Sequence, residues 1–214
     1  MQVISTNVGQ KTIVKWRGND VETGIYKYPI NETIHLGITD VKNDFVIDRR
    51  YHGGSDKACY LYSANHYAEW QEKLPNLNWQ WGMFGENITV EGLDESKIHI
   101  GDIYKLGTAL VQITQPRQPC FKLGIRLNSP KSVKLFVASE KPGAYVRVLK
   151  TGEVKTGDTM DLIECKSANF TLQKVFHLIY HAPENIEEVS IAIKMPELAE
   201  SCRKDLIKYS KIME

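Results

Sequence analysis

The sequence predicts a mainly β protein, a barrel or sandwich of short strands with one inserted helix, followed by a small helical tail. Many short apolar runs with β-branched residues are punctuated by glycines through most of the chain, which is typical of such sheets. From Thr171 onward the apolar residues recur at helical spacing instead. We therefore expect a β domain over residues 1–164 and a small helical domain over residues 165–214.

The predicted strands are short apolar runs. In chain order they are Gln2–Asn7, Thr12–Trp16, Phe45–Ile47, Asn87–Val90, Ile103–Leu106, Leu110–Thr114, Tyr145–Leu149 and Met160–Ile163. Gly107 and Thr108 separate two of these runs and predict a tight hairpin turn. The segments Ile100–Ile103 and Thr156–Thr159 each place Gly-Asp just before a strand, a turn suited to leading a strand into a barrel wall.

Helices are expected in two places. Within the β region, Ser63 is a suitable N-cap for a helix that ends at Leu74, before Pro75. In the tail we expect three short helices, which contain Leu172–Ile179, Glu184–Ile193 and Pro196–Tyr209, the last with proline in its first turn. Three such helices bury little surface alone, so they are expected to pack on the barrel or on a partner.

Composition excludes several classes of function. A formal net charge of +1 over 214 residues provides no broad basic surface for nucleic acid. No apolar run approaches the roughly 18 residues of a membrane span, and the N-terminal residues lack a secretory signal, so we expect a cytoplasmic protein without a membrane. Four widely spaced cysteines are then expected as reduced thiols: Cys59, Cys120, Cys165 and Cys202.

The most informative segment is Gln115-Pro116-Arg117-Gln118-Pro119-Cys120, which follows a predicted strand. Its two prolines stiffen the turn that carries Cys120. A guanidinium near a thiol lowers the pKa of the thiol, so Arg117 favours a thiolate, which can act as a nucleophile or as a soft metal ligand. Local chemistry alone also allows Cys120 to be a small buried apolar residue.

Two further segments carry candidate ligands. In Tyr51–Tyr60, His52 precedes Gly53, Gly54 and Lys57, and a glycine pair beside a lysine is suited to holding an anion. The same residues are equally consistent with an ordinary turn that has no ligand. The second segment is Gly85-Glu86-Asn87, which offers acceptor and amide groups at the entry of a strand and is equally consistent with a loop that caps that strand.

Standard alternatives are mostly absent from the sequence. Paired cysteines or histidines at zinc-finger spacing do not occur, nor do the P-loop, the dinucleotide-binding and the nucleophile-elbow glycine motifs. Trp79 and Trp81 are more consistent with core or lid residues than with a nucleotide-stacking platform, because no basic stripe surrounds them. A hydrolytic dyad of Cys120 and His52 stays open.

The three segments, taken in this order, closely resemble the MOSC domain, which is named after the C-terminal domain of molybdenum-cofactor sulfurase. The resemblance covers residues 1–164, and the tail is similar to the three-helix domain of stand-alone bacterial members. It implies a β-barrel of the pyruvate-kinase type with a pocket for the pterin-based molybdenum cofactor (molybdopterin). Cys120 would ligate molybdenum or carry sulfur without pyridoxal phosphate. The implied cofactor-binding residues are His52, Gly53, Gly54, Lys57, Gly85, Asn87 and Arg117.

The resemblance also implies an activity. Similar members reduce N-hydroxylated compounds, including hydroxylaminopurines, and so detoxify them with electrons from a separate flavoprotein reductase. His52 or Glu86 would then relay protons to the substrate. Two alternatives remain: a non-catalytic module that carries the cofactor or sulfur to another protein, and a molybdenum-free thiol hydrolase that uses Cys120 and His52. The physiological substrate, the electron donor and the oligomeric state are left open by the sequence.

Overall fold

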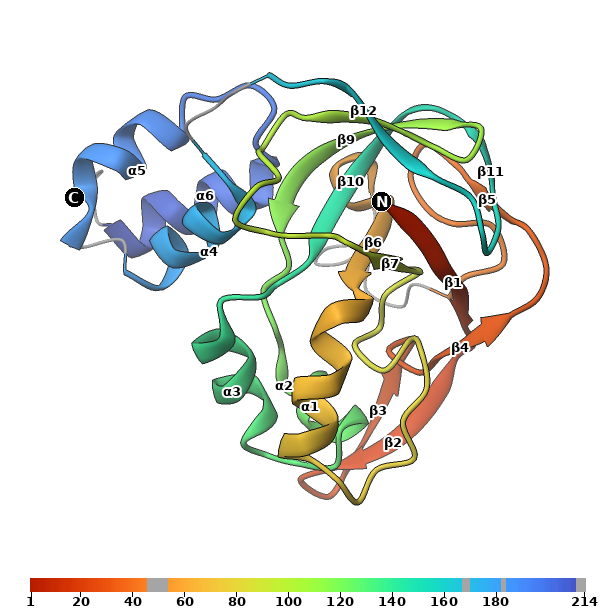
Figure 1. Ribbon diagram of the computed structural model, residues 1–214. Coiled ribbons are helices and arrows are strands. Elements are labelled where there is room, and N and C mark those ends of the chain that lie inside the picture. Colours follow the sequence, from red (N-terminus) through yellow and green to blue (C-terminus); the bar gives the residue numbers. More distant parts are fainter. Residues whose placement is uncertain (46–53, 167–169, 182–183, 211–214) are drawn as a thin grey trace.

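The fold is organised by one large mixed sheet, seen in a computed structural model that describes residues 1–45, 54–166, 170–181 and 184–210. Its eight strands follow the order β12-β8-β9-β10-β6-β7-β1-β4, and all neighbours are antiparallel except β6 and β7 (Figure 1). The strands are β1 (Gln2–Gly9), β4 (Lys27–Ile30), β6 (Cys59–Ser63), β7 (Ile88–Glu91), β8 (Ile103–Leu106), β9 (Ala109–Pro116), β10 (Ala144–Lys150) and β12 (Met160–Glu164).

The two ends of this sheet approach each other. The backbone N–H of Val3 donates to Asp158 O at 2.8 Å, Gly157 N donates to Val3 O at 2.9 Å, and Met160 N donates to Met1 O at 3.0 Å. These bonds join β1 to the turn that precedes β12, although the strand order of the described residues is not that of a closed barrel. The curled sheet confirms the predicted mainly β fold class.

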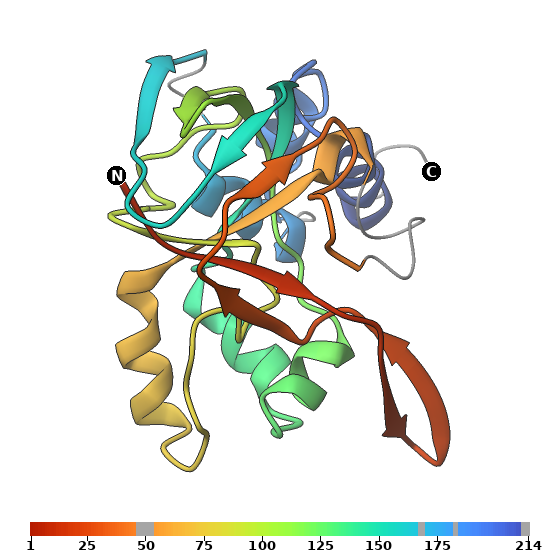
Figure 2. The ribbon, with the colours of Figure 1, turned by 90° about the vertical axis from the view of Figure 1, so that its right-hand side faces the viewer.

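Within the described ranges, two small sheets and six α-helices complete the fold. The hairpin of β2 (Thr12–Trp16) and β3 (Asn19–Thr23) projects from the body, and β5 (Ile34–Leu36) pairs with β11 (Gly152–Val154) (Figure 2). The helices form two groups at different ends of the molecule (Figure 1). One group is α1 (Tyr67–Lys73), α2 (Phe121–Arg126) and α3 (Ser132–Ser139); the other is α4 (Leu172–Tyr180), α5 (Ile186–Ala192) and α6 (Glu200–Ser210).

The tail helices share a core with the sheet. Leu172, Val175 and Leu206 are fully buried in the same apolar cluster as Leu61 and Val111 from the sheet. The predicted division at residue 165 coincides with the end of β12, but its independence as a domain stays a prediction. Among the described residues, no helix has the length and apolar character needed to cross a membrane.

Most predicted elements are found, and the hairpin at Gly107 is confirmed by the pairing of Leu106 with Ala109. The two Gly-Asp segments, Gly101-Asp102 and Gly157-Asp158, form the same kind of turn. Gly101 and Gly157 have φ of 91° and 92°. Asp102 accepts a bond from the backbone N–H three residues earlier at 2.9 Å, and Asp158 does the same at 2.9 Å. Because a positive φ is costly for residues with a Cβ, glycine precedes the aspartate in both turns.

Three local predictions need correction. Ser63 does not cap a helix with its side chain: its hydroxyl donates to Leu93 O at 2.8 Å, and a 3-10 turn over Ala64–His66 precedes α1. The last helix begins at Glu200, not Pro196, because the preceding turn docks on the sheet, where Ala199 N donates to Thr114 O at 3.1 Å. Phe45 lies outside any strand, and the rest of that predicted strand lies outside the described residues.

Candidate functional site

Cys120 lies where the chain leaves the sheet and enters a helix. β9 ends at Pro116, and α2 begins directly after Cys120, whose carbonyl accepts a bond from Leu123 N at 2.9 Å. The side chain of Cys120 is half-buried. The stiff motif therefore holds the sulfur at the junction of the sheet with α2.

Arg117 is the charged centre of the site. Its side chain is buried, and its guanidinium lies 5.1 Å from the ring of Tyr60 and 5.4 Å from the ring of Phe136. Burial alone would lower the pKa of Arg117, but Tyr60, Tyr145 and Cys120 outweigh it and raise that pKa. Among the described residues, Nη1 of Arg117 has no hydrogen-bond partner. A buried donor left in this state costs about 1–3 kcal/mol, so the site is prepared for an acceptor that the protein does not supply.

Tyr145, on β10, connects the charged residues of the site. Its ring centroid lies 5.1 Å from that of Tyr60 and 6.0 Å from Nζ of Lys57. Burial raises the pKa of Tyr145, against the opposing effect of the adjacent Arg117, and Cys120 raises it further. The hydroxyl therefore keeps its proton at neutral pH, close to both Arg117 and Cys120.

Lys57 is held by a well-anchored turn over Ser55–Lys57. In this turn Asp56 accepts from Arg147 Nη2 at 2.6 Å and from Glu200 N at 3.1 Å. Burial lowers the pKa of Lys57, while Cys202, Asp205 and Asp56 act in the opposite direction. Lys57 thus provides a partly desolvated cation near the Tyr145 ring.

Gly54 begins this turn with φ of 84°, and a Cβ built there would meet no described atom within 4 Å. The backbone beside Lys57 is therefore open to a ligand, as expected for the glycine pair. His52 and Gly53, which complete the predicted motif, lie outside the described residues. Their predicted roles stay predictions.

Glu86 anchors a loop. Its side chain is fully buried and accepts bonds from Gly82 N at 2.9 Å, Phe84 N at 3.1 Å and the Thr89 hydroxyl at 2.9 Å, with a further bond from the Tyr67 hydroxyl. Burial raises the pKa of Glu86, and these donors oppose the rise. Such contacts define a positioning role, and the proton relay expected of Glu86 stays a prediction.

The neighbours of Glu86 also serve the framework. Gly85 adopts φ of 76°, and a Cβ there would come within 3.0 Å of Ile25. Asn87 donates from Nδ2 to Asp44 at 2.9 Å and accepts from Tyr60 N at 3.2 Å, so it fixes the strand that carries Tyr60. Asp44 also forms a buried ion pair with Lys27. The predicted contact of Gly85 and Asn87 with a cofactor is untested by these bonds.

The helical tail contributes to the site. Gln118, from the cysteine motif, donates to Asp205 on α6 at 2.8 Å. Ser201, one turn earlier on the same helix, donates to Gln115 at 2.9 Å. Helix α6 therefore holds the motif by the two glutamines that lie on either side of Arg117.

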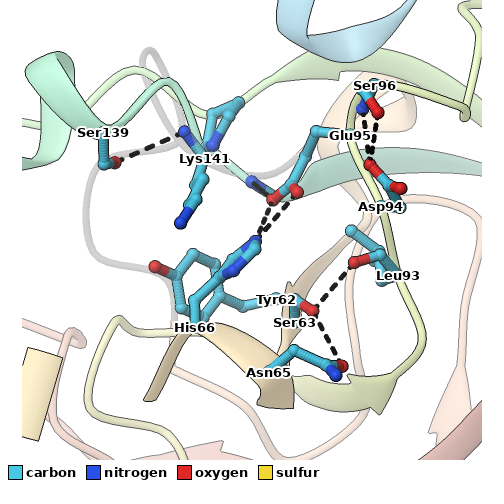
Figure 3. Close-up of polar contacts among 12 residues, drawn as sticks. Tyr62, Ser63, Asn65, His66, Leu93, Asp94, Glu95, Ser96, Ser139 and Lys141 are labelled. Atoms are coloured by element: carbon cyan, nitrogen blue, oxygen red, sulfur yellow. Dashed lines mark hydrogen bonds and ion pairs between the residues drawn. The ribbon is translucent and has the colours of Figure 1, made fainter. Parts of the chain in front are cut away.

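A second set of contacts fixes the loop that hydrogen-bonds the Tyr60 hydroxyl. Glu95 is buried and accepts from His66 at 2.8 Å and from Gly143 N at 2.9 Å, and Figure 3 shows its carboxylate pointing toward His66. The preceding residue, Pro142, accepts the hydroxyl bond of Tyr60 at 2.9 Å. This network ties the first turn of α1 to the loop on which Tyr60 rests.

A cavity of about 260 Å³ lies elsewhere in the molecule. It is lined by residues that include Ile30 of β4, His35 of β5, Glu153 of β11, and Glu32 between the first two strands. Because it contains none of the motif residues, the cysteine motif and not this cavity is the candidate site.

Sequence reasoning missed several residues around Cys120. Tyr60 lies at the end of the glycine motif and could have been noticed there. Tyr145 was predicted only as part of a strand, and its place beside the motif follows from the register that pairs it with Gln115. Phe136 and Asp205 belong to helices that dock from other parts of the chain, and no local signal marks them.

Fold and site together define a mainly β protein with a half-buried cysteine beside a buried arginine. The chain belongs to the MOSC domain family, whose model matches residues 48–161. Relatives span nearly the whole chain. YflK of Bacillus subtilis is 35% identical over 208 residues, covering 96% of this chain and 93% of that protein. The crystal structure of YiiM from Geobacillus stearothermophilus is 32% identical, with a TM-score of 0.82 and 98% coverage of both chains.

A third relative has a longer chain. The protein named "Reductase" of Gibberella moniliformis is 34% identical over 150 residues, which cover 69% of this chain and 27% of that protein. MOSC domains are associated with binding of the molybdenum cofactor. The residues present fit this anionic group, because Nη1 of Arg117 needs an acceptor and there is space beside Gly54.

Proposed function

We propose that this protein is a molybdenum-cofactor-dependent reductase of N-hydroxylated compounds of the hydroxylaminopurine type. Electrons would come from a separate flavoprotein reductase, and the protein would work in the cytoplasm. The observation that carries the proposal is the buried guanidinium of Arg117, whose unpartnered Nη1 lies beside a half-buried cysteine. The relative named "Reductase" supports an oxidoreductase role.

Each residue has a distinct task in this proposal. Arg117 and Lys57 would bind the negative charge of the cofactor phosphate, and the absence of a side chain at Gly54 would leave room for it. Cys120 offers a sulfur ligand to the metal, because a thiolate is a soft donor. When bound, the cofactor supplies the redox centre that delivers two electrons to the substrate.

The reaction also needs two protons. A hydroxylamine takes up two electrons and two protons, its N–O bond breaks, and an amine and water are released. The Tyr145 hydroxyl keeps its proton and lies close to Arg117 and Cys120, so it is a suitable proton donor. His52 and Glu86 are the donors expected from the sequence, and Glu86 would need to leave its buried set of bonds to act.

The test is reduction of a hydroxylaminopurine by cofactor-loaded protein, with a flavoprotein reductase as electron source. We expect Cys120→Ser to abolish turnover while the fold survives, because serine is nearly isosteric and a poor soft-metal ligand. Cys59→Ser, Cys165→Ser and Cys202→Ser are the controls and should keep their activity per folded chain. Full activity of Cys120→Ser would remove the thiolate from the mechanism.

The same assay separates the alternatives. A carrier of cofactor, or of sulfur on Cys120, would bind and release its cargo to a second protein but would not reduce the hydroxylamine. A thiol hydrolase would remain active after expression in a host unable to make the cofactor. Either result would overturn the proposed reductase activity.

A further inference from the structure

Three side chains with metal-ligating chemistry meet where the sheet passes into the tail. They are His99 and Asp102, in the turn before β8, and Cys165, directly after β12. Their candidate ligand atoms all lie within 4.8 Å of one another. The pairing of β12 with β8 brings them together across more than sixty positions of sequence. None of the three belongs to the cysteine-motif site.

One oxygen of the Asp102 carboxylate has a hydrogen-bond partner, and the other has none among the described residues. Oδ2 accepts from His99 N at 2.9 Å, and Asp158 makes the equivalent bond to Lys155 N at 2.9 Å in the second Gly-Asp turn. The turn therefore accounts for one oxygen in each case. Asp158 is half-buried, whereas Asp102 is 1% exposed, and Oδ1 of Asp102 has no partner among the described residues.

His99 presents a buried nitrogen to the same point. Its Nδ1 lies 3.4 Å from Oδ2 of Asp102 but makes no hydrogen bond within the described part of the chain. The turn itself is fixed, because Ile100 N donates to Phe170 O at 2.9 Å and His99 is bridged to Thr171. The nitrogen is therefore held in place by the backbone of both the sheet and the tail.

The lysine that follows Cys165 is already paired. The adjacent Lys166 is engaged with Glu164, at 2.5 Å. Buried carboxylates are stable when they are paired with a cation or coordinate a metal. A divalent cation between His99, Asp102 and Cys165 would satisfy both unpartnered atoms at once.

We propose that His99, Asp102 and Cys165 form a zinc site, with water in the fourth position. Imidazole nitrogen, thiolate sulfur and carboxylate oxygen are the three ligand types that zinc takes in proteins. Bonds of about 2.0–2.3 Å in a tetrahedron place neighbouring ligand atoms roughly 3.4–3.8 Å apart. The 3.4 Å between Nδ1 of His99 and Oδ2 of Asp102 places the ring and the carboxylate close enough to share one ion. Sγ of Cys165 lies within 4.8 Å of the other ligand atoms, so a side-chain adjustment brings it to bonding distance.

Binding has a defined charge balance and a defined structural effect. The thiol of Cys165 releases its proton as the sulfur coordinates, so two negative ligands neutralise the divalent ion. No electron transfer is involved. The ion would fasten the edge of the sheet to the first residues of the tail.

The experiment measures zinc bound by the full-length chain, in a Cys120→Ser background that removes the competing thiol. Metal-free protein is dialysed against Zn²⁺ and analysed for metal, and cobalt is used in parallel for its thiolate charge-transfer absorption. We expect one zinc per chain, with affinity reduced on the order of tenfold or more by Cys165→Ser and by His99→Asn. Cys165→Ser should also remove the thiolate absorption.

Two controls guard against binding elsewhere. Asp158→Ala removes the equivalent turn bond at a position that supplies no ligand, and this variant should keep the zinc. His177→Asn disrupts the surface pair of His177 and His181, whose ring centroids are 4.4 Å apart, and should also keep it. Absence of stoichiometric zinc, loss of zinc in His177→Asn, or unchanged binding in Cys165→Ser and His99→Asn would overturn the proposal.

Discussion

Arg117→Met tests whether the buried guanidinium serves a ligand or the fold. Methionine is unbranched and flexible, so it fills much of the volume between Tyr60 and Phe136 without the charge. If Arg117 is prepared for an anion, the substitution should affect the cofactor-free and the cofactor-loaded protein very differently.

The magnitude follows from the contacts of Arg117. In the cofactor-free protein the variant loses two cation–π contacts, each worth about 0.5–2 kcal/mol. It also removes a buried donor whose lack of a partner costs about 1–3 kcal/mol. The two effects oppose each other, so we expect the free energy of unfolding to change by only about 1 kcal/mol.

Cofactor binding should respond more strongly. A hydrogen bond to a charged group contributes about 1.5–3 kcal/mol. At about 1.4 kcal/mol per factor of ten, its loss weakens affinity roughly ten- to hundred-fold. The assays are urea unfolding of protein made in a host that lacks the cofactor, and molybdenum content of protein made in a host that supplies it.

Arg126→Met is a matched control. Arg126 also lies against two aromatic rings, 4.9 Å from Tyr26 and 5.4 Å from Tyr28, but it lies at the far end of α2 from Cys120. Its substitution should leave molybdenum content unchanged. A destabilisation of Arg117→Met by more than about 3 kcal/mol without cofactor, or wild-type molybdenum content in this variant, would refute the reasoning and make Arg117 a structural residue.

Further predictions concern four other changes. Tyr145→Phe keeps the ring contacts but removes the proton, so kcat should fall about 100-fold at similar KM in steady-state reduction assays. Lys57 binds an anion only below its pKa, which burial lowers, so molybdenum retention on dialysis should fall as pH rises toward that pKa, and Lys57→Arg should retain it to higher pH. Glu86→Gln places an amide NH2 group against the N–H and O–H donors that surround Glu86, so the free energy of unfolding in urea should fall by about 1–3 kcal/mol. Deleting residues 165–214 should give insoluble protein, because the tail shares the core of the sheet.

Each of these has a contrary outcome. Unchanged kcat in Tyr145→Phe would exclude its hydroxyl as the proton donor. A retention profile for Lys57→Arg that matches the wild type would show that Lys57 does not contact the anion. Wild-type stability of Glu86→Gln would contradict its anchoring role, and a soluble, active truncated chain would show that the tail is dispensable.

The sequence was sufficient to predict those elements whose ends are determined by neighbouring residues. The β8–β9 hairpin follows from Gly107, and the end of α1 follows from Pro75, since both depend on the residues at hand. Helices α2 and α3 were missed because α2 contains Gly124, a poor helix former, and because Val133 and Val137 in α3 favour strand. The start of α6 was misplaced because docking on the sheet, and not Pro196, determines it.

The candidate site also contains residues that a short motif predicts and residues that only the fold brings together. The motif indicated Cys120 and Arg117 because a stiff proline turn with a cysteine is visible in six consecutive residues. The aromatic rings that hold Arg117 come from β6 and α3, and the acceptor of Gln118 comes from α6. Such partners are brought together by strand register and helix docking, which the residues themselves do not encode at short range.

The contacts of α6 with the cysteine motif have an evolutionary consequence. Gln115 bonds to Ser201, and Gln118 bonds to Asp205, although each pair is separated by more than eighty positions. A substitution in the motif therefore alters what the tail must offer. In relatives that possess both parts, positions 118 and 205 should vary together, and a motif exchanged between two members without its own α6 should lose activity that the matching helix restores.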